Sequence, residues 1–149
     1  MTKPQELRET ASKNDPWPLF IEFALSLRGW WIDVCGAFDL TPVQGLALRT
    51  LDPASPMAMS ALADTLACDA SNVTGVVDKL EARGLIARQA SGNDRRVKVL
   101  VVTEKGRDLR RKLFARADTP PPALAALPQK TRDLLTEVLR TLLSDRATI

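Results

Sequence analysis

The amino-acid sequence predicts a mainly α-helical fold with a small β element, contained in a single domain of residues 1–149. Over most of the chain, apolar residues recur every three or four positions, which is the period of amphipathic helices. Two short β-branched segments, "LIARQA" and "VKVLVV", flank a polar link, a pattern typical of a two-stranded hairpin. A length of 149 residues is ordinary for one domain with one hydrophobic core.

The first helix is predicted over residues 16–36. Asp15 can cap it, and Pro16 suits its first position because the N–H that proline lacks would be unpaired there. One face of this helix is unusually wide and apolar. Its members at helical spacing are Phe20, Phe23, Leu27, Trp30, Trp31 and Val34.

The second helix is expected to run from Thr41 to about Leu51. Thr41 and Gln44 have the spacing of a capping box, and a proline stands between them at the first helical position. Prolines then interrupt the chain, and a third helix is predicted to begin at Ser60. Its inward residues should be Leu62, Ala63 and Leu66.

The fourth helix is predicted from its cap at Asp69 to a C-terminal glycine at Gly84. Gly75 interrupts its middle, where glycine costs about 1 kcal/mol relative to alanine. The prediction of a helix survives because a complete apolar stripe runs through the segment. The stripe comprises Val73, Val76, Val77 and Leu80.

After the predicted hairpin, Thr103 is expected to cap a highly charged helix that extends to about residue 118. The segment "TPPPALAALP" should end that helix, since successive prolines cannot continue it. A last helix begins at Pro128 and carries an apolar stripe of its own. The stripe consists of Leu134, Leu135, Val138, Leu139 and Leu142.

The composition argues against catalysis and against membrane insertion. The chain has no histidine and only two cysteines, which leaves few groups for acid–base chemistry or for a zinc site. No segment reaches the ~20 apolar residues of a membrane span, and the N-terminus lacks the apolar core of a signal peptide. We therefore expect a cytoplasmic protein that is not an enzyme and that needs no cofactor, no metal and no membrane.

The charge distribution and the order of elements point to nucleic acid. Residues 40–118 hold 13 Lys and Arg against 9 Asp and Glu, whereas residues 1–39 hold 4 against 6. Within the basic region, two helices joined by a short turn precede the hairpin, which is the order of a winged helix-turn-helix. A helix fits the major groove of DNA, and an extended loop with arginine fits the minor groove.

Four segments of the chain resemble the MarR family of transcriptional regulators, a class of winged helix-turn-helix proteins. The joint occurrence of "VVDKLEARGLI", "DRR" and "TEKG" at family spacing makes the resemblance specific, whereas "DRR" alone would mean nothing. The matching segments are "LTPVQGLALRTLDP", "MSALADTLACDASNVTGVVDKLEARGLIAR", "NDRRVKVLVVTEKG" and "LPQKTRDLLTEVLRTLL".

This resemblance implies a homodimer on a pseudo-palindromic, double-stranded DNA operator. Residues 1–40 and 119–149 would supply the dimerisation helices, and residues 41–118 the DNA-binding region. The resemblance also implies a recognition helix within residues 69–79 and a wing in which Asp94 braces Arg96 for the minor groove. A carboxylate can hold a guanidinium through two parallel hydrogen bonds, which fits that role.

On a helical wheel, one polar face of the recognition helix lies opposite the valine stripe. Candidate contacts to bases or phosphates on it are Ser71, Asn72, Thr74, Gly75 and Lys79, although helix capping is an alternative role for the first three. In the wing the candidates are Arg95, Arg96 and Lys98, with a solvated loop as the alternative. Asp78 is expected to orient a neighbouring cation that binds a base or a phosphate, rather than to touch DNA itself. Many relatives have arginine or another long polar residue at the positions of Ala70 and Gly75, so direct reading of the major groove is expected to be poorer here. A turn glycine is usual at the position of Ala67, so the junction of the two helices is expected to differ.

Two further pairs of residues invite functional interpretations. Trp30 and Trp31 could line a pocket for a small aromatic or phenolic ligand, as the resemblance implies, but packing in a dimer core is the preferred interpretation. Cys35 and Cys68 could sense oxidants, as cysteines do in some relatives. Cys35 lies among hydrophobic neighbours and Cys68 falls at an apolar position of the turn, where a thiol is normally inert.

The sequence therefore predicts a dimeric, sequence-specific DNA-binding repressor that a small molecule releases. A winged-helix module for protein–protein interaction and a cysteine-based redox regulator are the alternatives. An enzyme is the weakest alternative, since no glycine-rich phosphate loop or catalytic cluster is present.

Overall fold

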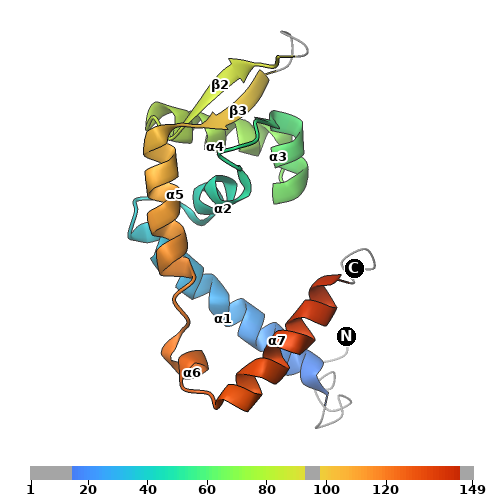
Figure 1. The fold of residues 1–149 in the computed structure, drawn as a ribbon. Coiled ribbons are helices and arrows are strands. Elements are labelled where there is room, and N and C mark those ends of the chain that lie inside the picture. Colours follow the sequence, from blue (N-terminus) through green and yellow to red (C-terminus); the bar gives the residue numbers. More distant parts are fainter. Residues whose placement is uncertain (1–14, 93–97, 145–149) are drawn as a thin grey trace, which may run out of the picture. The chain divides into compact units, whose positions relative to one another are not determined.

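The computed structural model describes residues 15–92 and 98–144, and the chain divides into two compact units, Met1–Arg116 and Ala117–Ile149. The predicted mainly helical fold with a small β element is confirmed; one domain over the whole chain stays a prediction. The elements in order are α1 (Pro16–Gly36), α2 (Pro42–Thr50), β1 (Met57–Ala58), α3 (Met59–Leu66), α4 (Ala70–Ala82), β2 (Ile86–Ala90), β3 (Lys98–Val102), α5 (Glu104–Ala117), α6 (Pro122–Ala125) and α7 (Gln129–Ser144) (Figure 1).

The predicted N-terminal caps of α1 and α2 are confirmed. The Asp15 carboxylate accepts a hydrogen bond of 3.0 Å from the backbone N–H of Trp17. At α2 the Thr41 hydroxyl accepts from the backbone N–H of Gln44 at 3.3 Å, and the Gln44 side chain accepts from the backbone N–H of Thr41 at 2.9 Å. This reciprocal pair satisfies two N–H groups that a helix start otherwise leaves unpaired.

A close approach between α1 and α2 depends on Gly45. A Cβ atom at this position would lie 2.4 Å from the Cys35 sulfur and 3.1 Å from Cζ2 of Trp31. The same contact is fixed by a hydrogen bond of 3.1 Å that Trp31 Nε1 donates to the carbonyl oxygen of Pro42. Glycine at this position therefore lets the two helices pack closely.

Helices α2, α3 and α4 contact one another, and α4 contacts β2 (Figure 1). α3 begins at Met59, one residue before the predicted start at Ser60. Its three predicted inward residues are buried, as are three of the four residues of the α4 stripe. The fourth, Val76, is half-buried. The buried residues of the two helices are Leu62, Ala63, Leu66, Val73, Val77 and Leu80.

The junction between α3 and α4 holds an alanine in the left-handed conformation. Ala67 has φ 48° and ψ 42°, the region that glycine adopts without a Cβ penalty. Ala67 thus adopts at some cost the conformation that a turn glycine would adopt, and a changed junction between the two helices stays a prediction. Asp69 occupies the N-cap position of α4, but its side chain makes no capping hydrogen bond, so the predicted cap is correct only in position.

The sheet has three antiparallel strands in the order β1-β3-β2, one strand more than predicted. β2 and β3 pair from Ile86 opposite Val102 to Ala90 opposite Lys98, which confirms the predicted hairpin. The additional strand, β1, pairs Met57 with Leu100. A strand of two residues is too short to show an alternating pattern, so sequence periodicity could not reveal it.

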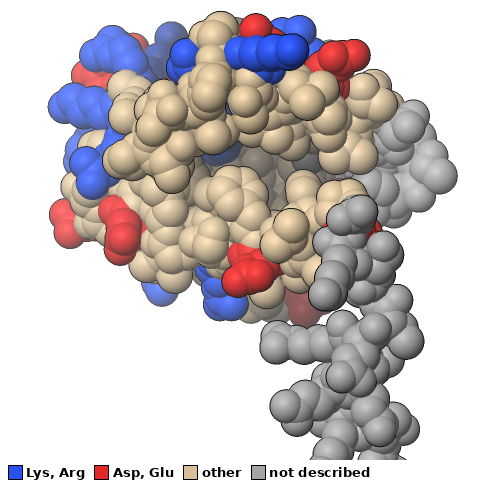
Figure 2. Space-filling view, turned by 90° about the horizontal axis from the view of Figure 1, so that it is seen from below, with Lys and Arg blue, Asp and Glu red and all other residues tan. Residues whose placement is uncertain are grey.

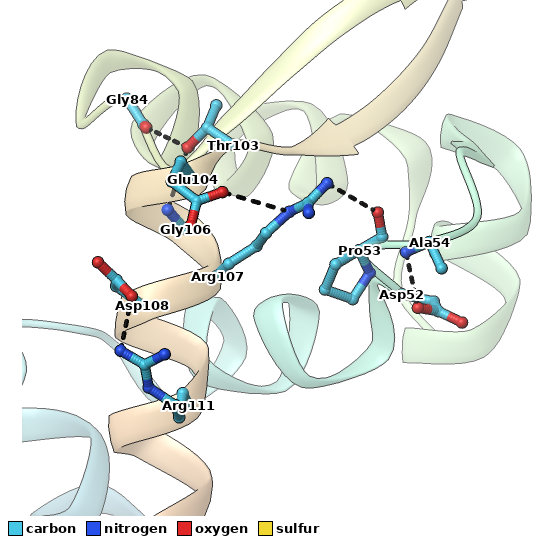
Figure 3. A network of polar contacts seen from close by, with 10 residues as sticks. All are labelled: Asp52, Pro53, Ala54, Gly84, Thr103, Glu104, Gly106, Arg107, Asp108 and Arg111. Carbon is cyan, nitrogen blue, oxygen red and sulfur yellow. Dashed lines mark hydrogen bonds and ion pairs between the residues drawn. The ribbon is translucent and has the colours of Figure 1, made fainter.

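Thr103 fixes the start of α5 against the end of α4 (Figure 3). Its hydroxyl accepts from the backbone N–H of Gly106 at 3.0 Å, as a cap does, and donates to the carbonyl oxygen of Gly84 at 2.6 Å. A Cβ atom on Gly106 would lie 1.9 Å from the carbonyl oxygen of Leu85, so only glycine fits. The predicted turn at Gly84 is confirmed by its φ of 69°.

In the second unit, α6 is a short helix inside the proline-rich segment, where no helix was predicted. α7 follows Pro128 as predicted. None of the α7 residues is buried, and its apolar stripe stays largely exposed. A groove of about 220 Å³ runs between α6 and α7, lined by Pro120, Leu124, Ala125, Arg132, Leu135, Thr136 and Leu139. Among all the helices described, none has the length and hydrophobicity that a membrane span requires.

Candidate nucleic-acid interface

Helix α4 separates a buried side from an exposed polar side. Val73, Val77 and Leu80 are at most 1% exposed and attach the helix to the core. The predicted DNA-facing residues lie together on the opposite, solvent-exposed side. They are Ser71, Asn72, Thr74, Gly75 and Lys79. The structure therefore brings these five residues onto one accessible face, and their contact with DNA stays a prediction.

The side chains on this face differ in their hydrogen bonding. The hydroxyl of Thr74 donates to the carbonyl oxygen of Ala70 at 2.9 Å, so in this rotamer it offers an outside partner only acceptor lone pairs. Within the described part of the chain, the side chains of Ser71, Asn72 and Lys79 make no hydrogen bond or ion pair. These three can therefore bind an outside partner without first breaking an internal contact.

Gly75 lies near the middle of the exposed face, and nothing in the structure requires a glycine there. A Cβ atom at this position would meet no other atom within 4 Å. This contrasts with Gly45 and Gly106, where the surrounding atoms exclude a side chain. The helix backbone at Gly75 is therefore open to close approach by a partner.

Arg88, on β2, is a residue of the site that the sequence analysis missed. Its guanidinium forms an ion pair of 2.5 Å with the Asp78 carboxylate and a second ion pair with Glu81, so it joins two carboxylates of α4. The hydrogen bond to Asp78 is the main cause that raises the pKa of Arg88 above its ordinary value. Asp78 thus pairs with a neighbouring cation, and the prediction that it orients a cation which binds a base or a phosphate stays a prediction. The glutamate and the last arginine of "EARGLIAR" were the signal in the sequence. To recognise their contact, however, one must know that β2 lies beside α4.

Many cations of the basic region bind backbone carbonyl groups of the protein itself. Arg83 donates to Asp39 and Phe38, and Lys105 donates to Arg83. From α5, Arg107 donates to the carbonyl of Pro53 at 3.3 Å (Figure 3), and Arg110 donates to the carbonyls of Leu48 and Arg49. These side chains stabilise turns and helix ends. These cations keep their charge but are fixed in position, so the number of basic residues in the sequence does not by itself give the number that meet DNA.

The hairpin carries one described candidate. Lys98 is exposed at the first position of β3, opposite Ala90, and forms no ion pair or hydrogen bond through its side chain with the residues described. The predicted wing residues Asp94, Arg95 and Arg96 lie outside the described residues. The structure thus brings Lys98 to the base of the predicted wing, and the bracing of Arg96 by Asp94 stays a prediction.

The candidate ligand and redox residues lie on α1 and at the α3–α4 junction. Trp30 and Trp31 are both half-buried, with ring centroids 6.0 Å apart. Cys35 is buried, and burial raises the pKa of its thiol, which disfavours the reactive thiolate. Cys68 is half-buried, and its thiol donates to the carbonyl of Leu66. A ligand pocket at the tryptophans and a redox role for the cysteines both stay predictions.

Comparison with known proteins identifies the family. Residues 40–98, from the residue before the α2 cap to the first residue of β3, match the model of the MarR family. Over 102 residues the chain is 30% identical to the HTH-type transcriptional regulator MhqR of Bacillus subtilis (strain 168), a match that covers 68% of this chain and 70% of MhqR. The chain belongs to the MarR family. Membership of this family of transcriptional regulators indicates a non-enzymatic role, in agreement with the composition.

Other MarR-type proteins match in sequence or fold. The transcriptional repressor MprA of Escherichia coli (strain K12) is 37% identical over 91 residues, which cover 57% of this chain and only 49% of MprA. The structure of a MarR family protein from Bacillus stearothermophilus superposes with a TM-score of 0.79 over 99% of this chain and 100% of that one, at 19% identity. CouR from Rhodococcus jostii RHA1, bound to p-coumaroyl-CoA, superposes with a TM-score of 0.68 over 89% of this chain and 94% of that one, at 26% identity. The predictions of the family and of the winged-helix fold are thus confirmed.

Proposed function

We propose that this MarR family chain is a homodimeric repressor that binds a pseudo-palindromic operator in double-stranded DNA. The observation that carries the proposal is the exposed polar face of α4 beside the β2–β3 hairpin, within residues that match the MarR family model. A helix of this kind fits the major groove, and the hairpin tip can reach the adjacent minor groove. The repressor role takes support from the name of MprA. The proposed location is the cytoplasm, where such a regulator meets its operator.

On the proposed interface, side chains divide by chemistry. Ser71, Asn72 and Thr74 would bond base edges or nearby phosphates, while Lys79 and Lys98 would bind phosphates as point charges. At the wing tip, Arg96 braced by Asp94 would enter the minor groove and Arg95 would bind the backbone. The phosphate contacts should supply much of the affinity, so binding should weaken steeply with salt.

Dimerisation would cover apolar side chains that a single chain exposes. On α1, Trp17 is 61% and Leu25 is 66% exposed, and on α7 Leu134 is 61% exposed. On the face drawn in Figure 2, residues other than Lys, Arg, Asp and Glu cover much of the surface between the charged side chains. Soluble monomers rarely expose large contiguous apolar patches, whereas subunit interfaces are built from them. The terminal helices are therefore the proposed interface between two copies.

The proposed release signal is a small aromatic or phenolic molecule. CouR, a relative of similar fold, is described with bound p-coumaroyl-CoA. Trp30 and Trp31 would offer aromatic faces for such a ligand, and a partly exposed indole pair suits a flat apolar molecule. The proposal includes no cofactor and no metal.

The test is a fluorescence anisotropy titration of the full chain with labelled duplexes from the promoter region of its own gene. We expect tight binding to one inverted-repeat duplex, weaker binding to a shuffled duplex, and a large loss of affinity in an Arg96→Ala variant. Lack of salt-sensitive binding to any of these duplexes would overturn the proposal and favour a protein-interaction module. Unchanged binding by Arg96→Ala would overturn the wing assignment alone.

A further inference from the structure

The exposed face of α4 contains negative charge close to its proposed DNA contacts. Asp78 lies next to Lys79 in the chain, and its side chain is 58% exposed; Glu81 follows one helical turn later. An unpaired carboxylate at such a place would repel the phosphate backbone, because like charges brought together at an interface cost affinity. A DNA-binding face with this sequence therefore needs a counter-charge for Asp78.

Arg88 occupies the position that such a counter-charge requires. Its Nη2 lies 2.5 Å from Oδ1 of Asp78, and its Nη1 contacts Oε2 of Glu81. The side chain is only 25% exposed, so it is more shielded from solvent than Asp78. One cation of β2 thus bridges two anions of α4.

The backbone of Arg88 takes part in the same arrangement. Its N–H donates to Oε1 of Glu81 at 3.1 Å, so Glu81 accepts both the backbone and the side chain of one residue. A single exposed ion pair contributes little to stability, because solvent screens it and the side chains lose entropy. Here Glu81 binds both the backbone N–H and the guanidinium of Arg88, which pre-organises the contact with Asp78.

We propose that Arg88 is a positioning residue for DNA binding: held by Glu81, it pairs with Asp78 and lowers the net negative charge on the face of α4 that meets the phosphate backbone. This inference rests on the proposed DNA binding and adds a residue and a role to it. Without Arg88, the carboxylate of Asp78 would be free to turn toward the phosphates. Replacement of Asp78 by asparagine would remove the need for Arg88.

The experiment measures the DNA affinity of the full-length wild type and of Arg88→Ala, Asp78→Asn and the double variant. We expect Arg88→Ala to bind the operator duplex roughly tenfold more weakly, with the deficit larger at low salt, where charge repulsion is least screened. Asp78→Asn should bind at least as tightly as the wild type. In the double variant, the asparagine should restore most of the lost affinity.

Arg111→Ala is the matched control, because Arg111 pairs with Asp108 at 2.7 Å on α5 and has no part in the proposed interface. It should bind DNA as the wild type does. Thermal unfolding of each variant, followed by circular dichroism, shows which of them are folded at the temperature of the titration. A merely structural role for Arg88 would not be relieved by Asp78→Asn, so the rescue separates the two roles.

The outcomes distinguish this inference from the proposed function. Failure of the wild type to bind duplex DNA would overturn both. Binding by the wild type together with unchanged affinity in Arg88→Ala, or with no rescue in the double variant, would overturn the inference and leave DNA binding intact. A loss of affinity in Arg88→Ala that Asp78→Asn reverses would support it.

Discussion

Helices α4 and α7 have similar sequence patterns, but one is buried along its apolar stripe and the other is not. Each has an apolar stripe at helical spacing, over 13 residues in α4 and 16 in α7. The α4 stripe is buried against α2, α3 and β2, with Val77 and Leu80 at 0% exposure. By contrast, α7 buries no residue, and Leu142 is 48% exposed.

The comparison teaches that an apolar stripe predicts a helix but not the partner of that helix. Periodicity records which side of a helix avoids water, and the tertiary contacts decide what covers that side. For α4 the cover is supplied by its own unit. No residue of α7 is buried, so we propose that a second copy of the chain covers its stripe. For this reason the terminal helices belong to the proposed dimer interface.

The largest expected effect tests the buried stripe. Replacing Leu80, which is 0% exposed, by alanine should lower the free energy of unfolding by about 2–5 kcal/mol, since it leaves a cavity in the core. Urea unfolding at several protein concentrations measures it. Leu46→Ala is the control, at a leucine that is 41% exposed on α2, and it should cost much less. Equal losses would contradict the assignment of the core to α4.

The exposed stripe is tested by a change that should alter assembly. The double variant Leu139→Asp, Leu142→Asp places two charges on the apolar side of α7. It should raise the dissociation constant of the proposed dimer by roughly thirtyfold or more, which corresponds to a loss of about 2 kcal/mol at an interface. Light scattering after size-exclusion chromatography gives the mass. Thr141→Asp, on the polar side, is the control. A wild-type monomer, or a double variant that stays dimeric, would contradict the proposed interface.

Gly75 adds to the comparison, because it is a position at which the sequence of α4 does not give the most stable helix. Gly75→Ala should raise the free energy of unfolding by about 1 kcal/mol, since the new methyl meets nothing within 4 Å. Thermal unfolding checks this, and an unchanged midpoint would contradict it. A simultaneous loss of DNA affinity would indicate that the helix backbone approaches the groove closely; retained affinity would indicate that Gly75 is merely a position without a long side chain.

The smallest expected effect concerns the junction before α4. Ala67→Gly should stabilise the protein by roughly 0.5 kcal/mol, the difference between relief of the left-handed alanine and the entropy cost of glycine. Chemical denaturation checks this change. Ala63→Gly, in the α3 helix, is the control and should destabilise. A loss of stability in Ala67→Gly would mean that the αL alanine is not strained.

Local signals in the sequence predicted local structure well. The caps at Asp15, Thr41 and Thr103 depend only on residues three or fewer positions away, so spacing alone revealed them. The apolar stripes likewise revealed α1, α3, α4 and α7, whereas the caps at Thr41 and Thr103 revealed α2 and α5. By contrast, β1 has two residues and α6 has four, and neither is long enough for a period to appear.

The features that the sequence did not reveal depend on contacts between distant segments. Gly45 and Gly106 look like ordinary helix glycines until α1 packs against the first and Leu85, just before β2, packs against the second. Arg88 looks like a surface arginine until β2 lies beside α4. The same limit applied to charge, because the sequence shows how many cations there are but not what each one binds.

The cations that bind backbone carbonyls have a consequence for the thermodynamics of association. Each phosphate that a protein neutralises on duplex DNA releases condensed counterions and adds about 0.9 to the steepness with which log K falls against log salt concentration. Arg83, Lys105, Arg107 and Arg110 are held by carbonyl groups of the fold, so these cations would neutralise only phosphates that come within reach of their fixed positions. The number of ions released should therefore follow the few exposed cations near α4 and the hairpin, and fall well below the number of basic residues in the chain.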